Sequence, residues 1–239
     1  MKIKKELKNE KKEVYPDDCA FFLKSILRVS HAIQETDDIN QMMEDVLDLM
    51  LEIFKCDRVF LLYPCDIDAE FWNVPMERSV AEWPGLGVTP DQKVPNTPGS
   101  KGVFKAMLDA DDVVAFDSTT KHETPEDIAE QFNIRSQIAI AIHPKVGKPW
   151  SFGMHQCSHA RIWSEEDKVI FREISYLMGG ALGNLLLLDD LKKTKGDLIK
   201  KVGELGKANE LMVGRELKMI ELKKELENKL EEAASGDEK

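Results

Sequence analysis

The sequence lacks any apolar run that approaches the roughly 18 consecutive residues needed to cross a bilayer. Its charged N-terminus is not followed by the hydrophobic segment of a signal peptide. Cysteines are few, and Cys19, Cys56, Cys65 and Cys157 form neither a CxxC pair nor a zinc-ligand spacing. We therefore expect a cytoplasmic protein with reduced thiols and no association with a membrane.

An excess of basic residues is also missing, since the formal net charge is −11. Residues 1–13 hold six lysines and three acidic residues, and residues 189–239 hold twelve basic and thirteen acidic residues. The negative charge is therefore concentrated in residues 14–188. Because an acidic surface repels a phosphate backbone, we expect no nucleic-acid binding by this part of the chain.

Familiar catalytic motifs are absent as well. The segment from Gly99 to Gly102 contains two glycines and a lysine, but it lacks the GxxxxGK[ST] spacing of a phosphate-binding loop. No Ser/His/Asp or paired-carboxylate pattern indicates an active site. The sequence therefore predicts a protein that is not an enzyme.

What the sequence does contain is a strand pattern from Trp150 to Cys157 in which large and small side chains alternate. Residues two apart on a strand share a face of the sheet. One face would carry Trp150, Phe152, Met154 and Gln156, and the other would carry Ser151, Gly153, His155 and Cys157. The second face is small and polar, which leaves room for a packed helix or a bound molecule.

The preceding segment, Ser136 to His143, alternates in the same way, with isoleucines on one face. The turn Lys145–Lys148 joins the two segments, so we expect an antiparallel hairpin. If the small faces of its two strands coincide, they line one shallow hollow. The residues of this hollow would be Ala139, Ala141, Gly153, His155 and Cys157.

Helices and further strands are expected before the hairpin, from periodicity and capping signals. Asp38 and Gln41 have the spacing of a capping box, as do Thr124 and Asp127. The predicted helices are 18–35, 38–54, 102–109 and 124–133, and the predicted strands are 58–63, one within 71–83, and 113–116. The prolines and glycines between Pro84 and Pro98 predict a surface loop. Together with the hairpin, this order predicts an α+β fold with a central antiparallel sheet of five to six strands.

A long helix is expected from Ser164, with Asp167 at the capping-box position. From Leu191 onward, apolar residues recur every seven positions, which predicts a weak coiled coil over residues 191–232. The recurring residues are Leu191, Leu198, Leu205, Met212, Met219 and Leu226. We expect residues 1–17 to be a charged lead-in, 18–190 to be one domain and 233–239 to be a disordered tail.

Three segments resemble GAF domains of sensor histidine kinases and phytochrome-like photoreceptors: PGSKGVFKAMLDADDVVAFDS, the hairpin RSQIAIAIHPKVGKPWSFGMHQCSHARIW, and SEEDKVIFREIS. The resemblance covers roughly residues 18–190. The segment NELMVGRELKMIELKKELENKL is similar to the helical linkers of sensor histidine kinases. A GAF module of this type implies signal transduction, a small-molecule ligand and, as partners, a histidine kinase or response regulator in a two-component system.

The resemblance suggests that His155 faces a ligand, since the matching histidine in phytochrome-like modules faces the chromophore. No cysteine of this chain is followed by histidine, so a covalently attached bilin is not expected. A haem is the alternative cofactor, with His155 as axial ligand, Cys157 as thiolate or attachment site, and Gly153, Ala139 and Ala141 providing room. On residue statistics alone, His155 is a satisfied core or surface residue and Cys157 a small buried hydrophobe.

Three functions remain open from the sequence. The first is a sensory module that binds a small molecule and passes its state through a dimeric helical linker. The second is a dimerising interaction protein whose GAF fold binds nothing. The third is a free methionine sulfoxide reductase, which in some GAF proteins uses a trio of pocket cysteines. The homodimer is predicted to form through the helices at Asp18–Gln34 and Ser164–Leu188 and the heptad stripe.

Overall fold

The computed structural model describes residues 16–36, 38–85, 92–110 and 112–236. Residues 1–15 of the expected lead-in 1–17, residues 86–91 of the expected loop and residues 237–239 of the expected tail lie outside these ranges. By compactness the chain divides into two units, residues 1–187 and residues 188–239. The first unit contains the sheet.

The sheet has six strands in the order β3-β2-β1-β6-β5-β4, and every neighbouring pair is antiparallel. The strands are β1 (Arg58–Tyr63), β2 (Phe71–Ser79), β3 (Val94–Pro95), β4 (Val114–Phe116), β5 (Ser136–Ile142) and β6 (Trp150–Gln156). The expected α+β class with a central antiparallel sheet is therefore confirmed. Strands β1 and β6, far apart in the chain, lie at the centre side by side.

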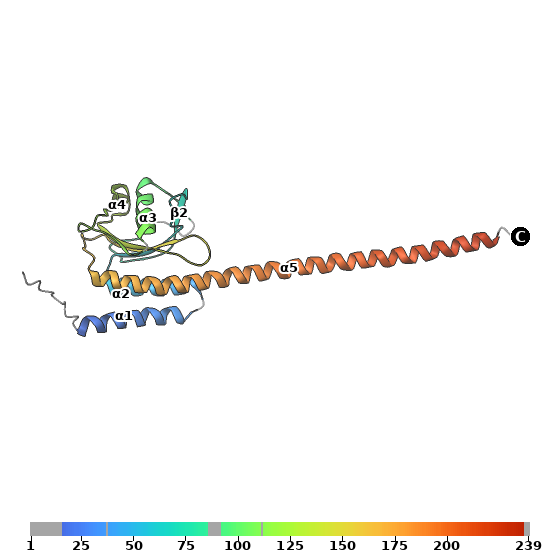
Figure 1. Ribbon diagram of the computed structural model, residues 1–239, viewed down its shortest axis with the longest axis horizontal. Coiled ribbons are helices and arrows are strands. Elements are labelled where there is room, and N and C mark those ends of the chain that lie inside the picture. The colour runs from blue at the N-terminus through green and yellow to red at the C-terminus, as the bar shows by residue number, and fades with distance from the viewer. Residues whose placement is uncertain (1–15, 37, 86–91, 111, 237–239) are drawn as a thin grey trace, which may run out of the picture. The chain divides into compact units, whose positions relative to one another are not determined.

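Helices cover both faces of the sheet (Figure 1). The helices are α1 (Pro16–Gln34), α2 (Ile39–Phe54), α3 (Pro98–Ala110), α4 (Glu126–Phe132) and α5 (Glu165–Gly236). One core joins α1, α2 and the start of α5 to the isoleucine face of β5 and the large-residue face of β6. A second core joins α3 and α4 to the opposite face.

Local signals explain where the helices on the first face begin. The Asp38 carboxylate accepts hydrogen bonds from the backbone N–H groups of Asn40 and Gln41, at 2.8 and 3.0 Å, which starts α2. Ser164 and Asp167 form the expected reciprocal capping box of α5, at 3.0 and 3.1 Å. Both caps were predicted from spacing alone.

Three helix starts differ from the sequence-based expectation. Helix α1 begins at Pro16 rather than after Asp18, and α3 begins at Pro98 rather than Gly102. Helix α4 has Pro125, not Thr124, at its N-cap. The side chain of Asp127, expected in a capping box, instead accepts a hydrogen bond from Thr97 Oγ1 at 2.9 Å. A tertiary contact to the start of α3 therefore replaces the local cap.

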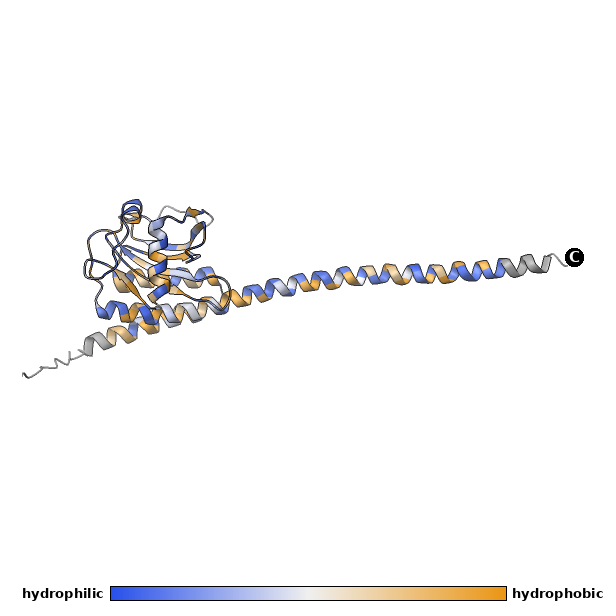
Figure 2. Cartoon of the chain, turned by 45° about the horizontal axis from the view of Figure 1, so that its top comes forward, coloured by the Kyte–Doolittle hydropathy of each residue, from blue (hydrophilic) through white to orange (hydrophobic). Residues whose placement is uncertain are grey.

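The second unit, residues 188–239, contains the rest of α5, which is helical as far as Gly236. Residues 233–236, expected in the tail, are therefore helical. Figure 2 shows apolar residues recurring along this part of the helix. The six heptad residues from Leu191 to Leu226 are each at least 60% exposed. In the described ranges, no helix is long and apolar enough to cross a membrane.

Candidate ligand-binding site

A small cavity lies within the second core, between the sheet and helices α3 and α4. It offers about 40 Å³ to the centres of water-sized molecules. Every residue that lines it is buried. These residues are Phe60, Leu62, Trp72, Ser100, Val103, Phe104, Ile128, Phe132, Ile134, Gln137, Ala139, Ser151 and His155. The site is thus an apolar chamber with a few polar groups in its wall.

The hairpin register brings two of those polar groups together. Gln137 on β5 is the direct cross-strand partner of His155 on β6. Directly opposed residues of an antiparallel pair have Cβ atoms about 5 Å apart on the same face. The alternation of β5, with Ile138, Ile140 and Ile142 in the other core, places both side chains on the cavity side.

Arg58 fixes the protonation state of His155. Its guanidinium Nη1 lies 3.3 Å from Nδ1 of His155. A guanidinium only donates, so Nδ1 accepts and the ring hydrogen sits on Nε2. Burial, together with the adjacent Arg58 charge, holds the pKa of His155 well below its usual range. The imidazole is therefore neutral and offers one N–H donor.

Arg58 itself is buried, and its charge is already compensated. Its Nε lies 3.2 Å from a carboxylate oxygen of Glu77. Its Nη1 donates to the backbone carbonyl of Phe132 at 3.2 Å, and its Nη2 donates to that of Pro84 at 2.7 Å. This side chain therefore joins the cavity wall at His155 to the end of α4 and to the segment after β2.

Two buried N–H groups of the cavity wall lack a hydrogen-bond partner in the part of the chain that the structure describes. They are Nε1 of Trp72 and Nε2 of Gln137. Such groups are rare because burying an unpaired donor costs about 1–3 kcal/mol. Two residues of the cavity wall therefore carry donors that no described residue satisfies.

The structure separates the five residues predicted to line one hollow. Ala139 and His155 line the cavity, as does Ser151, which the sequence placed on the same face. Gly153 lies between them, but the ring of Phe60 occupies the space beside it: a Cβ on Gly153 would lie 2.5 Å from Phe60 Cζ. Ala141 borders a different groove, beside α5.

Cys157 also lies away from the cavity. It follows the last residue of β6 and borders a surface depression beside Trp83 and the end of α4. Burial is the main cause that raises its pKa, so it is a thiol rather than a thiolate. Burial likewise raises the pKa of Cys56 and of Cys65 to about 12. None of these three cysteines lines the cavity, so they form no trio of reactive thiols there.

A haem does not fit the residues of this site. A space of about 40 Å³ is far below the roughly 300–1,000 Å³ of ordinary ligand pockets, so it is too small for a macrocycle. Because Nδ1 of His155 accepts from Arg58, the ring hydrogen sits on Nε2, so neither nitrogen has a free lone pair for an iron. Cys157 is not in the cavity wall. Among the described residues, no group of three or more His, Cys, Asp or Glu side chains could hold a metal ion.

Sequence reasoning missed Phe60, Trp72 and Gln137. Gln137 had a detectable signal, because it shares its strand face with Ala139 and precedes the isoleucine alternation. Phe60 and Trp72 carried none, since their strands, β1 and β2, lie elsewhere in the chain. Only the fold brings them to the hairpin.

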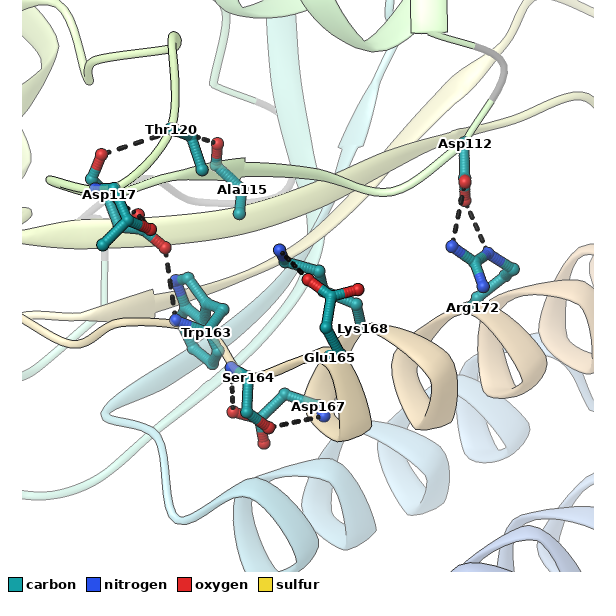
Figure 3. Close-up of polar contacts among 11 residues, drawn as sticks. Asp112, Ala115, Asp117, Thr120, Trp163, Ser164, Glu165, Asp167, Lys168 and Arg172 are labelled. Atoms are coloured by element: carbon teal, nitrogen blue, oxygen red, sulfur yellow. Dashed lines mark hydrogen bonds and ion pairs between the residues drawn. The ribbon is translucent and has the colours of Figure 1, made fainter. Parts of the chain in front are cut away.

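The segment that connects β6 to α5 is held by two aspartates. Asp57 Oδ2 accepts hydrogen bonds from the backbone N–H groups of Cys157 and Ser158, both at 2.7 Å, and from the side chains of Gln156 and Ser158, at 2.7 and 2.8 Å. Asp117 accepts one from the backbone N–H of Trp163 at 3.2 Å (Figure 3). Both ends of this connection, residues 157–164, are therefore fixed by carboxylates from other elements.

Further contacts hold the connection and the first turns of α5. Arg161 donates to the carbonyl of Phe54 at 2.6 Å and pairs with Asp167 at 3.1 Å. Arg172 pairs through two nitrogens with Asp112, which precedes β4 (Figure 3). The start of α5 is thus tied to β4, to α2 and to the end of β6.

Comparison with known proteins identifies the fold. No protein-family model matches the chain. The methanogenesis regulatory histidine kinase FilI of Methanothrix harundinacea (strain 6Ac) is 25% identical over 189 residues. The match covers 75% of this chain but only 20% of that kinase, so the chain spans about a fifth of the length of this curated relative.

Among solved structures, the chromophore-binding domain of bacteriophytochrome RpBphP3 from R. palustris has a TM-score of 0.57 at 12% identity, covering 73% of this chain and 64% of that one. The far-red absorbing dark state of JSC1_58120g3 with bound biliverdin has a TM-score of 0.56 at 14% identity, and the match covers 67% of this chain and 98% of that one. The GAF domain of a phosphoenolpyruvate-protein phosphotransferase from Acinetobacter has a TM-score of 0.53 at 10% identity, and the match covers 71% of this chain and 97% of that one. The chain therefore has the GAF fold.

Proposed function

We propose that this GAF-fold chain is a cytoplasmic sensory module that binds a small molecule in the cavity and passes its state through α5. One observation carries the proposal. A buried cavity with unpaired N–H donors is walled by β6, and β6 leads through the connection 157–164 directly into α5. A ligand that shifts β6 would shift the start of that helix.

The contacts of Arg58 and Asp57 support a short route from the cavity to the helix. Arg58 touches His155 in the cavity wall, and the neighbouring residue Asp57 holds the backbone of Cys157 and Ser158. A change at His155 is therefore next to the anchor of the connection. Small shifts at a binding site become larger ones where rigid elements have two packings.

Exposed apolar side chains support a parallel homodimer with a coiled coil. On α1, Phe21, Leu23 and Leu27 are 49%, 54% and 58% exposed. The heptad residues of α5 are exposed as well, and a long single helix is marginal without a packed apolar face. A second copy of the same chain would cover each set with the matching set of the partner.

The relationship to a regulatory histidine kinase supports a role in a two-component system. FilI is described as a kinase that regulates methanogenesis, and 75% of this chain matches part of it. A histidine kinase or a response regulator is therefore the partner we propose for the helical end of the dimer.

The test measures ligand binding and the geometry of α5 on the same full-length chain. A spin label is placed at Lys200→Cys, a polar position of α5, and small molecules are screened by thermal shift. A ligand that raises Tm by mass action should also change the label-to-label distance in the dimer. The Ala139→Val variant, whose added methyl groups fill the cavity wall, should lose both responses. Ligands that bind with no change at the label would contradict the proposal.

A dimerising protein that binds nothing is the second candidate. The observation in its favour is the small size of the cavity and the ring of Phe60 beside Gly153. This candidate predicts a dimer whose Tm and label distance respond to no compound in the screen.

A further inference from the structure

The polar groups of the cavity wall differ in whether their hydrogen-bond donors are already paired. The two serines already donate their hydroxyl hydrogens: Ser100 to Asn96 Oδ1 at 2.7 Å, and Ser151 to the sulfur of Met107 at 3.5 Å. Trp72 Nε1 and Gln137 Nε2 have no partner within the described ranges. His155 carries its single N–H on Nε2, because Nδ1 accepts from Arg58. The unused capacity is therefore mainly donor capacity.

None of the described residues that line this space is an Asp, Glu, Lys or Arg. Arg58, the cation that contacts His155 in the wall, already has Glu77 as its counter-ion and donates to two carbonyls. Burying an anion without a free cationic partner is strongly unfavourable, whereas a neutral acceptor needs only the donors that are present. The rest of the wall is aliphatic or aromatic.

We infer that the cavity binds a small uncharged molecule of about four non-hydrogen atoms, with a carbonyl oxygen as acceptor and an apolar remainder. The carbonyl oxygen accepts hydrogen bonds from the donors at Gln137, His155 and Trp72, and the apolar part packs on Phe60 and Ala139. The small size follows from a space of about 40 Å³, which is far below the roughly 300–1,000 Å³ of pockets for drug-sized ligands. This inference rests on the proposed function, in which the cavity is the ligand site, and specifies the ligand class.

Affinity for so small a molecule has an upper bound. The best ligands of this size reach a dissociation constant of roughly 40 μM, and ordinary ones are weaker. We therefore expect constants between about 0.05 and 10 mM for simple probes.

Three probes of nearly the same shape test the class: acetone, a neutral carbonyl; acetate, an anion; and isobutene, which lacks the oxygen. The full chain is labelled with ¹⁵N at its four tryptophan indoles. The Trp72 signal is assigned with Trp72→Phe, and the other three serve as internal references. Acetone should move the Trp72 indole proton downfield with saturation. Isobutene should bind at least about fivefold more weakly, the effect of one lost hydrogen bond, and without a downfield shift. Acetate should show no saturable shift.

Variants separate a binding role from a structural one. Gln137→Leu keeps the size of the side chain but removes its amide, so acetone should bind at least about fivefold more weakly while isobutene binds as well as before or better. The control is Cys157→Ala, a buried residue next to β6 that lies outside the cavity. Titrations of this variant with acetone, acetate and isobutene should give the same dissociation constants and shifts as those of the wild type.

Equal binding of acetone and isobutene would overturn the hydrogen-bond assignment, and tight binding of acetate would overturn the neutral class. If none of the probes saturates, yet another compound still moves the α5 label in a cavity-dependent way, the inference is wrong and the proposed function stands. If acetone saturates as expected but no ligand moves the label, the inference stands and the proposed function fails.

Discussion

Asp57 fixes the end of the central strand β6 through a single carboxylate oxygen that accepts four hydrogen bonds. Burial opposes the charged form of this residue, but hydrogen bonds from Ser158 and Cys157 outweigh it, so its pKa lies below the ordinary value. The unfolded chain therefore takes up this proton before the folded one as the pH falls. Asp57 contributes stability above the unfolded pKa and loses it as the pH falls toward the folded pKa.

We predict that Asp57→Asn lowers the free energy of unfolding at pH 7 by about 2–3 kcal/mol, because charge-assisted hydrogen bonds to buried backbone groups are lost. The difference from the wild type should shrink between about pH 5 and pH 3, where the wild type loses the contribution of this carboxylate. Urea denaturation over a pH series measures it. Ser158→Ala keeps the Asp57 carboxylate but removes the hydroxyl that donates to it and accepts from Gln156 Nε2, so it should cost about 1–2 kcal/mol. A difference that grows toward low pH would contradict the assignment.

Gly153 shows the effect of one missing side chain at the centre of the sheet. A Cβ there would lie 2.5 Å from Phe60 Cζ and 3.0 Å from both Ala139 Cβ and the carbonyl oxygen of Ile138. Phe60 also stacks on His155, with ring centroids 4.3 Å apart. Displacing its ring therefore disturbs the cavity wall as well.

We predict that Gly153→Ala lowers the free energy of unfolding by about 1–3 kcal/mol through overpacking, as seen in a lower urea midpoint. The matched control is Gly102→Ala in α3, where an added Cβ meets nothing within 4 Å. That change should stabilise by about 0.5–1 kcal/mol, because alanine favours a helix over glycine. Equal effects of the two substitutions would show that backbone propensity, not packing, governs position 153.

At the scale of elements, the start of α5 depends on its cap and on the contacts that tie it to β4 and α2. Ser164 accepts a hydrogen bond from the backbone N–H of Asp167, which would otherwise be unpaired in the first turn. In the proposed function, this turn receives the movement of β6. Its stability is therefore linked directly to the proposed output.

We predict that Ser164→Ala destabilises the protein by about 1 kcal/mol and speeds hydrogen exchange at the Asp167 and Lys168 amides. Hydrogen-exchange mass spectrometry or NMR measures this. Ser118→Ala, at an exposed serine in the segment after β4, should change neither quantity. Unchanged exchange in Ser164→Ala would mean that Arg161 and Asp117 alone hold the first turn.

At the scale of the whole molecule, the homodimer is the central expectation. Light scattering at micromolar concentration should give twice the 27.2 kDa mass of one chain. The double substitution Leu198→Lys and Leu205→Lys places charge in the heptad stripe and should loosen the helical extension while the GAF unit stays folded. Asp197→Lys with Glu204→Lys, at the adjacent non-stripe positions, is the control and should keep the paired helix. A wild-type mass of one chain would refute the dimer.

The sequence by itself determined the features that depend only on residues close together in the chain, namely strand alternation and helix caps. Alternation along Ser136–His143 and Trp150–Cys157 placed the large residues in one core, and local spacing gave the caps at Asp38 and Ser164, because these features need only backbone periodicity and contacts within four residues. The α+β class and the likeness to GAF domains followed from the order of such elements.

Only the tertiary structure decided the shape and chemistry of the cavity. Phe60 occupies the space beside Gly153, and Arg58 sets the tautomer of His155. Trp72, which carries an unpaired N–H, reaches the cavity wall from β2, a strand that does not neighbour the hairpin. Cys157, placed on the same face by alternation, lies outside the cavity since β6 ends before it. The volume of a cavity is what remains after side chains distant in sequence have packed, and periodicity along one strand carries no information about it.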